Sequence, residues 1–142
     1  HGYGRNTFDV DLVIKLDPDS IRRAFAALAE IDYSPRVPII AEQFADPEQR
    51  RRLLQDKHMQ VLNFWSDKHR ETPLDVFVTE PFDFAAEYER ADQREIEPGL
   101  KVRIVSLRTL LEMKRAANRP KDLADIDELS LLYELPSSYD AK

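Results

Sequence analysis

The sequence predicts an α/β fold of the α+β kind, with helices packed on a mixed, twisted sheet and two helices closing the chain. Two early segments alternate apolar and polar residues, as strands with one buried face do. Two other segments, which open at Pro18 and Pro120, repeat apolar residues every three to four positions, as amphipathic helices do. Strand-like and helix-like segments are also interspersed along the chain, which excludes an all-helical or all-strand protein.

The first half of the chain is predicted to supply the main sheet. A strand over 7–15 leads into a helix that Asp17 caps and Pro18 opens, because these residue types favour those positions. The polar turn over 66–72 predicts a hairpin between the strands on either side of it. The remaining predicted elements of this half are a strand over 37–41, a short helix opened by Asp46-Pro-Glu, a strand over 58–65 and a strand over 73–78.

The second half is predicted to alternate short strands and helices. A helix over 82–91 precedes two short strands around the Pro98-Gly99 turn. Ser106 is a suitable cap for a helix that runs to about 117, and Pro120 opens the last helix. The strands are expected over 93–97 and 100–105, and the inward stripes are expected at Leu107, Leu110 and Leu111 and at Leu123, Ile126, Leu129 and Tyr133.

Length and composition bound the class of protein. A chain of 142 residues predicts a single domain over 1–142, and its 42% hydrophobic residues suffice for one core. A net charge of -6 argues against broad nucleic-acid binding. No apolar run approaches the roughly 18–20 residues that cross a bilayer. The absence of cysteine excludes disulfides and thiolate chemistry, and we expect a cytoplasmic protein without membrane contact.

Several conspicuous side chains have ordinary interpretations. The arginines over 50–52 are interpreted as a solvated helix face, with binding of an acceptor as the alternative. His58 and His69 are interpreted as surface residues, which leaves a zinc site without support. Phe64 and Trp65 are interpreted as core residues rather than as platforms for stacking bases.

Three aspartates point to metal chemistry. Asp9 and Asp11 fall on one face of the first predicted strand, opposite its apolar residues, and Asp75 has the same setting on the strand over 73–78. Neighbouring carboxylates repel each other, and Mg²⁺ or Mn²⁺ offsets that repulsion with the oxygen ligands it prefers. If the two strands are neighbours, the three carboxylates can form a two-metal site for phosphoryl transfer. The alternative is a solvated strand face.

Three segments together carry a resemblance. They are Gly-Tyr-Gly-Arg-Asn-Thr-Phe-Asp-Val-Asp-Leu over 2–12, Leu-Asp-Val around Asp75, and Lys114 followed by Arg-Pro-Lys-Asp-Leu-Ala-Asp-Ile over 119–126. The chain resembles the nucleotidyltransferase superfamily, the fold of polymerase beta and of antibiotic nucleotidyltransferases. It is most similar to small bacterial stand-alone members of the abortive-infection toxin type.

The resemblance implies an enzyme that moves NMP from an NTP to an acceptor hydroxyl. The acceptor would be RNA such as a tRNA end, a protein or a small molecule, and a toxin-antitoxin or phage-defence role would bring an antitoxin partner. Asp75 would also accept the proton of the attacking hydroxyl. The implied catalytic and metal-binding residues are Asp9, Asp11 and Asp75, and the implied nucleotide-binding residues are Arg5, Lys114, Lys121 and Asp122.

The positions around the last two helices also have structural interpretations. Lys114 lies on an apolar stripe, so its ammonium needs an exit to water or an anionic partner, and we expect it to point to the aspartate cluster. Asp122 suits the first turn of a helix through the helix dipole. Lys121 and Asp125 have the spacing of an ordinary i,i+4 ion pair.

One family element has no counterpart in these 142 residues. The family has a Gly-Gly or Gly-Ser turn roughly ten residues before the first aspartate, where backbone N–H groups approach phosphates. Gly2 and Gly4 are too close to Asp9 to form it, so we expect this chain to lack that turn and the helix before it. The alternative function is therefore a catalytically inactive binding or regulatory module of the same fold. A third candidate function is that of an antibiotic nucleotidyltransferase, a class of enzyme that usually carries an additional helical domain.

Overall fold

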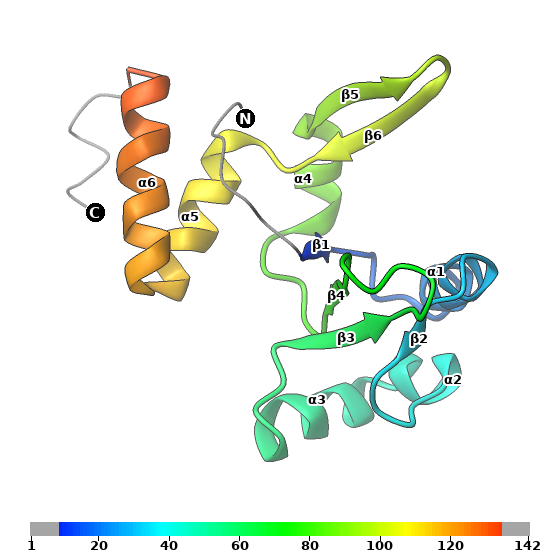
Figure 1. Cartoon of the computed structure of the whole chain (residues 1–142). Helices are drawn as coiled ribbons and strands as arrows, with labels where there is room; N and C mark the ends of the chain where they lie inside the picture. Colours follow the sequence, from blue (N-terminus) through cyan, green and yellow to red (C-terminus); the bar gives the residue numbers. More distant parts are fainter. Residues whose placement is uncertain (1–8, 135–142) are drawn as a thin grey trace. The chain divides into compact units, whose positions relative to one another are not determined.

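The computed structural model describes residues 9–134 as helices packed with a mixed sheet of four strands, together with a separate two-stranded sheet (Figure 1). The predicted mixed α/β architecture is confirmed. Contacts divide the described chain into an N-terminal unit over 9–84 and a C-terminal unit over 85–134, and each is described by itself. The prediction of one domain over 1–142 stays a prediction.

The four-stranded sheet belongs to the N-terminal unit and has the order β1-β4-β3-β2. Its outer strand β1 is parallel to β4, whereas β4 with β3 and β3 with β2 are antiparallel. The predicted hairpin is therefore confirmed as β3–β4. The strands are β1 (Val10–Leu12), β2 (Ser34–Pro35), β3 (Val61–Trp65) and β4 (Leu74–Phe77).

Three helices accompany this sheet: α1 (Pro18–Glu30), α2 (Ala41–Ala45) and α3 (Pro47–Asp56). The start of α1 is as predicted, because the Asp17 carboxylate accepts the Ser20 backbone N–H at 2.8 Å. Asp46 caps α3 in the same way, accepting the Glu48 N–H at 2.9 Å.

The predicted strand over 37–41 is wrong. Pairing with β3 occurs before residue 37, at β2, and one further backbone hydrogen bond follows β2, from the Arg36 N–H to the Asn63 carbonyl at 2.9 Å. The chain then leaves the sheet in a tight turn, in which the Ile39 N–H bonds to the Val37 carbonyl at 2.8 Å. Ala41 begins α2 instead of ending a strand. Apolar residues here pack against the core without strand pairing.

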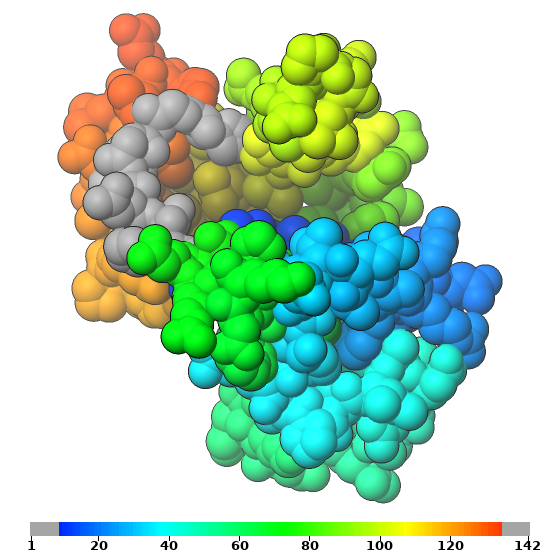
Figure 2. All heavy atoms as spheres, turned by 45° about the vertical axis from the view of Figure 1, so that its right-hand side comes forward, coloured from blue at the N-terminus to red at the C-terminus, as the bar shows by residue number. Residues whose placement is uncertain are grey.

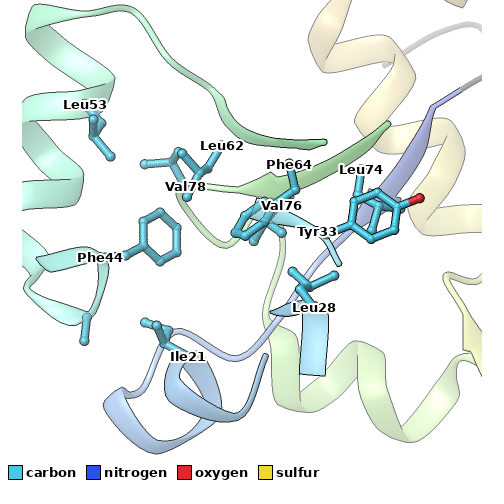
Figure 3. Close-up of a cluster of buried hydrophobic side chains, with 11 residues drawn as sticks. Ile21, Leu28, Tyr33, Phe44, Leu53, Leu62, Phe64, Leu74, Val76 and Val78 are labelled. Carbon is cyan, nitrogen blue, oxygen red and sulfur yellow. The ribbon is translucent and has the colours of Figure 1, made fainter. Parts of the chain in front are cut away.

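The core of the N-terminal unit lies between one face of the sheet and the helices (Figure 3). Alternation along β4 directs Leu74 and Val76 inward, and Phe64 on β3 is buried as predicted, together with Leu62. Val10, expected on the buried face of β1, is 42% exposed because β1 is the edge of the sheet. The cluster also includes Ile21, Leu28, Tyr33, Phe44, Ala45, Leu53 and Val78.

Arg50 corrects the interpretation of the arginine run as solvated. Its side chain is buried, and its Nη1 donates to the Phe44 carbonyl at 2.6 Å. The last carbonyls of a helix lack partners within the helix, and α2 ends at Ala45. The guanidinium of Arg50 satisfies one of these carbonyls and lies 5.9 Å from the Phe44 ring centroid. Arg51 and Arg52 are exposed, as expected.

The C-terminal unit contains a hairpin and a helix pair. The hairpin turns at Gly99, whose φ of +81° lies in the left-handed region that glycine adopts at little cost. The helices α5 and α6 bury Leu111 against Ile126 and Leu129. The predicted elements are confirmed as α4 (Phe84–Arg90), β5 (Asp92–Glu97), β6 (Leu100–Ile104), α5 (Leu107–Ala117) and α6 (Pro120–Leu132).

The inward stripe of α6 differs from the prediction. Leu123 and Tyr133 are 49% and 42% exposed. The buried residues of the helix include Asp122 and Asp125 alongside the two apolar ones. The periodicity of the sequence predicts burial for apolar residues only. These two acids are buried because cations of the same unit bind them, as described below.

A buried carboxylate joins α4 to the start of α5. Glu87 is 2% exposed and accepts three hydrogen bonds, from the Ser106 N–H at 2.6 Å, the Thr109 hydroxyl at 2.6 Å and Arg90 Nε at 2.5 Å. Burial raises the pKa of Glu87, but these hydrogen bonds outweigh it and lower the pKa to about 2. The side chain therefore stays ionised in the folded unit.

Within residues 9–134, none of the helices combines the length and the apolar character needed to span a membrane.

We predict that Glu87→Gln removes a pH-dependent part of the folding stability. The folded pKa of about 2 is below the ordinary glutamate value of 4.5, so the carboxylate stabilises the fold above about pH 4.5. This contribution disappears as the pH falls from 4.5 towards 2. At neutral pH the substitution should lower the free energy of unfolding by roughly 2–3 kcal/mol. Urea unfolding at pH 7, 4.5 and 3 measures both effects.

The matched control is Glu112→Gln, because Glu112 is an exposed acid of α5 paired only with exposed Arg108. Its substitution should change stability by less than about 0.5 kcal/mol. A Glu87→Gln variant that loses stability with falling pH as steeply as the parent would contradict the assignment.

Candidate functional site

The register of β1 on β4 brings two predicted site residues together. Asp11 and Asp75 are direct Cα partners in this parallel pair. Neighbouring strands lie about 4.8 Å apart, and residues paired in this way project to the same face of a sheet. Leu12 and Val76, the next pair along, lie on the opposite, core-side face. Asp11 and Asp75 are therefore neighbours on the face turned away from the core.

Asp9 lies immediately before β1 and is exposed. The Val10 N–H donates to the Pro73 carbonyl at 3.1 Å, which fixes the start of β1 beside the start of β4. Carboxylate oxygens are the donors that Mg²⁺ and Mn²⁺ prefer, so the adjacent pair fits such an ion in its chemistry. The part of the chain that the structure describes has no cluster of three or more His, Cys, Asp or Glu suited to a metal ion. The three-carboxylate site stays a prediction.

Asn63 is a site residue that the sequence reasoning missed. It is the β3 partner of Asp75, and its amide Nδ2 donates to Asp75 Oδ1. This hydrogen bond fixes the orientation of the carboxylate without neutralising its charge. The sequence did contain a signal for Asn63. The predicted turn over 66–72 is centred on residue 69, and residues 63 and 75 are equally far from that centre, so they lie opposite each other in the hairpin.

A depression of about 340 Å³ opens near these residues in the N-terminal unit. Arg36 contributes to its wall, and its backbone N–H bonds to the carbonyl of Asn63, the neighbour of Asp75. Trp65, interpreted above as a core residue, also lines it and is 39% exposed. The last residue of a strand whose earlier residues alternate between buried and half-buried thus belongs to a surface hollow.

The connection between β3 and β4 is anchored to the segment that follows α1. The rings of His69 and Tyr33 stack with centroids 5.6 Å apart and planes at 7°. The Tyr33 hydroxyl donates to the Thr72 carbonyl at 2.7 Å, and Lys68 Nζ lies 2.6 Å from Asp32 Oδ2. In Figure 2 the green atoms of this connection lie against light-blue atoms of the earlier segment. These contacts give the depression defined walls.

In the C-terminal unit, Lys114 has the anionic partner that its position required. Its side chain is 18% exposed, and its Nζ lies 2.6 Å from Asp125 Oδ2 and 3.9 Å from Asp122 Oδ1. Both carboxylates are buried, so the ammonium compensates charges that otherwise have little access to water. The expected approach of Lys114 to the aspartates of the other unit stays a prediction.

Asp122 has a structural role at the start of α6. Its Oδ2 accepts Arg119 Nε at 2.6 Å and the Arg119 backbone N–H at 3.2 Å. The hydrogen bond from Arg119 lowers the pKa of Asp122, and although burial opposes this, the charges of Arg119 and Lys114 lower it further. Lys121 is exposed in the same turn, and Arg5 lies outside the described residues. Nucleotide contacts for these residues stay predictions.

No family model matches the chain, and no curated protein shows significant similarity to it.

We predict that Lys114→Met destabilises the C-terminal unit. Methionine keeps much of the packing but leaves the buried Asp125 and Asp122 with less compensating charge. The free energy of unfolding should fall by roughly 2–4 kcal/mol, because removing one partner of a buried ion pair leaves an uncompensated charge. Urea unfolding at neutral pH measures the loss.

Two further variants test the cause. Lys121→Met removes an exposed lysine of α6 and should leave stability within about 0.5 kcal/mol of the parent. The double variant Lys114→Met with Asp125→Leu should recover part of the loss, because the uncompensated charge is gone. A single Lys114→Met variant as stable as the parent would show that the ion pair contributes nothing.

Proposed function

We propose that the chain is a metal-dependent nucleotidyltransferase that transfers NMP from an NTP to an acceptor hydroxyl. The observation that carries the proposal is the pairing of Asp11 with Asp75 on adjacent parallel strands. Two carboxylates on the same face of adjacent strands offer the oxygen ligands that Mg²⁺ and Mn²⁺ prefer. The resemblance of the three sequence segments to nucleotidyltransferases supports the same assignment.

The reaction forms a bond between the acceptor oxygen and the α-phosphorus and breaks the bond to the bridging oxygen, which leaves with pyrophosphate. Asp75 accepts the proton of the attacking hydroxyl, and the amide of Asn63 holds the carboxylate in place. Mg²⁺ or Mn²⁺, held by Asp11 and Asp75 together with Asp9, would supply neutralisation of the phosphate charge. Proton transfer of this kind contributes about 10²–10⁴-fold to a rate.

The proposal extends to the wider set of residues that the resemblance implies. Arg5, Lys114 and Lys121 would face the phosphates, and Asp122 would order the start of α6. The acceptor would be RNA, such as a tRNA end, a protein or a small molecule. The resemblance to the toxin-type members also implies a toxin-antitoxin or phage-defence setting with an antitoxin partner.

The second candidate is a catalytically inactive binding or regulatory module of the same fold. The ion pairs of the C-terminal unit favour it. Lys114 is paired with Asp125, and Asp122 is bonded by Arg119, so two of the residues implied for nucleotide binding already take part in internal interactions. A module that uses these side chains for folding alone would have the same contacts.

We predict that Asp75→Asn lowers NMP transfer by about 10²–10⁴-fold while the fold is kept, because the amide cannot accept the hydroxyl proton. The measurement is incorporation of label from each of the four NTPs, with Mg²⁺ or Mn²⁺, into a cell extract. Asp56→Asn is the control, since Asp56 is an exposed residue at the end of α3. Transfer by the Asp75→Asn variant at the parent's rate would remove Asp75 from the reaction.

We predict that Asp11→Asn keeps or raises thermal stability without metal, by up to about 1 kcal/mol, because it relieves repulsion from Asp75. It should also abolish stabilisation by Mg²⁺ with NTP, which raises the melting temperature of a protein that binds them. Thermal melts with and without Mg²⁺-NTP measure both effects. If the melting temperature of the variant still rises with Mg²⁺-NTP as the parent's does, Asp11 is not a ligand.

A further inference from the structure

The depression in the N-terminal unit has a composition unlike the rest of this acidic chain. Its volume of about 340 Å³ is at the small end of the range for ligand pockets, which is roughly 300–1,000 Å³. Two arginines, a tryptophan and one acid, Asp67, contribute to its wall, in a chain with a net charge of -6. The residues that carry the argument are Arg36, Trp65, Ser66, His69, Arg70 and Pro73.

The Trp65 side of the hollow lies on the face of the sheet that carries the carboxylate pair. Trp65 follows Asn63 by two positions on β3, so both project to the same side. Pro73 precedes β4, and its carbonyl accepts the N–H of Val10 at the start of β1. Asp11 follows Val10 directly and is the partner of Asp75. The pocket therefore begins about two strand positions from the carboxylates.

The charged side chains of the hollow are available to a ligand. Among residues 9–134, the exposed guanidinium of Arg36 makes no side-chain hydrogen bond or ion pair. Arg70 Nη2 lies 3.3 Å from Asp67 Oδ1, but both side chains are highly exposed, so this pair contributes little and exchanges readily. The hydroxyl-bearing Ser66 is buried at the base and accepts the Lys68 N–H at 3.2 Å.

The aromatic part of the hollow is also accessible. Trp65 is 39% exposed although the strand before it is half buried. A partly exposed indole is a platform on which any nucleobase can stack, because every base has a π-face. Arginine guanidinium groups match the oxygens of a phosphate in pairs. His69, held against Tyr33 by ring stacking, forms a fixed side of the same hollow.

We infer that this depression binds one nucleotide unit, with its base stacked on Trp65 and its phosphate bound by Arg36 and Arg70. A free nucleotide and the end of a single strand offer this same chemistry. The binding rests on the hollow alone. We assign the hollow a further role, in which a bound acceptor nucleotide presents its hydroxyl to Asp75, and this role rests on the proposed function. Binding and transfer are therefore measured separately.

Trp65 is the only tryptophan of the chain, so its fluorescence reports this hollow directly. AMP, adenosine and a single-stranded RNA of four adenosines are titrated into the full chain without NTP. AMP should quench Trp65 saturably and bind more tightly than adenosine, which lacks the phosphate. The RNA arm identifies the source: tighter binding of RNA than of AMP points to a strand end, and the reverse points to a free nucleotide.

Variants that retain Trp65 assign the phosphate contacts. Arg36→Gln and Arg70→Gln should each weaken binding of AMP by about tenfold or more, the effect of losing a charge-assisted hydrogen bond. Arg23→Gln is the matched control, because Arg23 is an exposed arginine of α1 away from the hollow, and its affinity for AMP should equal the parent's. If one of the two arginine variants fails to fold, the other still tests the phosphate contact.

The outcomes separate this inference from the proposed function. No quenching by AMP or RNA, or quenching that neither arginine variant weakens, overturns the inference even if NMP transfer is observed. Arginine-dependent quenching supports it even if no transfer is found. In the Asp75→Asn variant the quenching by AMP should persist, because that residue acts on the hydroxyl and not on the base or phosphate.

Discussion

The candidate site depends on one constraint, the burial of a single face of the four-stranded sheet. The side chains of Leu62 and Phe64 on β3 and of Leu74 and Val76 on β4 must point into the core, and they are nearly inaccessible to water. Because side chains alternate along a strand, this fixes Asp75 on the opposite face. A slip of one residue would bury the carboxylate and expose the apolar set, so the core specifies the register strongly. The chemistry of the outer face is thus a consequence of the packing on the inner one.

The parallel pairing of β1 with β4 extends this constraint to the start of the chain. A parallel connection needs a long crossover, and here it contains α1, α2, α3 and the hairpin strand β3. The helices of that crossover supply Ile21, Leu28, Phe44 and Leu53 to the same core. The segment that separates Asp11 from Asp75 in sequence is therefore also the one that holds their strands together, and disruption of the core is expected to disturb their alignment.

Much of the fold could be predicted because its boundaries have local chemical causes. Helix starts follow capping residues such as Asp17 and Ser106, and strands that bury one face show alternation. The two-residue strand β2 could not be predicted, since its pairing with β3 defines it and Pro35 weakens any local signal. The burial of Arg50 depends on a helix end elsewhere in the chain. In the site, strand parity predicted that Asp11 and Asp75 share a face only if their strands are neighbours, which the pairing of β1 with β4 established. The roles of Asn63 and the exposed Trp65 required the actual hairpin register.

The acidic residues of the two units are stabilised by different partners, and the difference bears on function. Glu87 and Asp122 are buried, and each accepts hydrogen bonds from an arginine that cancels its charge. Against the effect of burial, hydrogen bonds from Thr109, Arg90 and Ser106 lower the pKa of Glu87, and the hydrogen bond from Arg119 lowers that of Asp122, which is the behaviour of carboxylates that hold a fold together. Asp75, in contrast, accepts a hydrogen bond from the amide of Asn63, which orients the carboxylate but brings no positive charge. An arginine in that position would compete with any cation or proton that a reaction needs. If Asp75 acts as the proposed general base, a neutral donor such as the Asn63 amide would fix the direction of its carboxylate without competing for the proton.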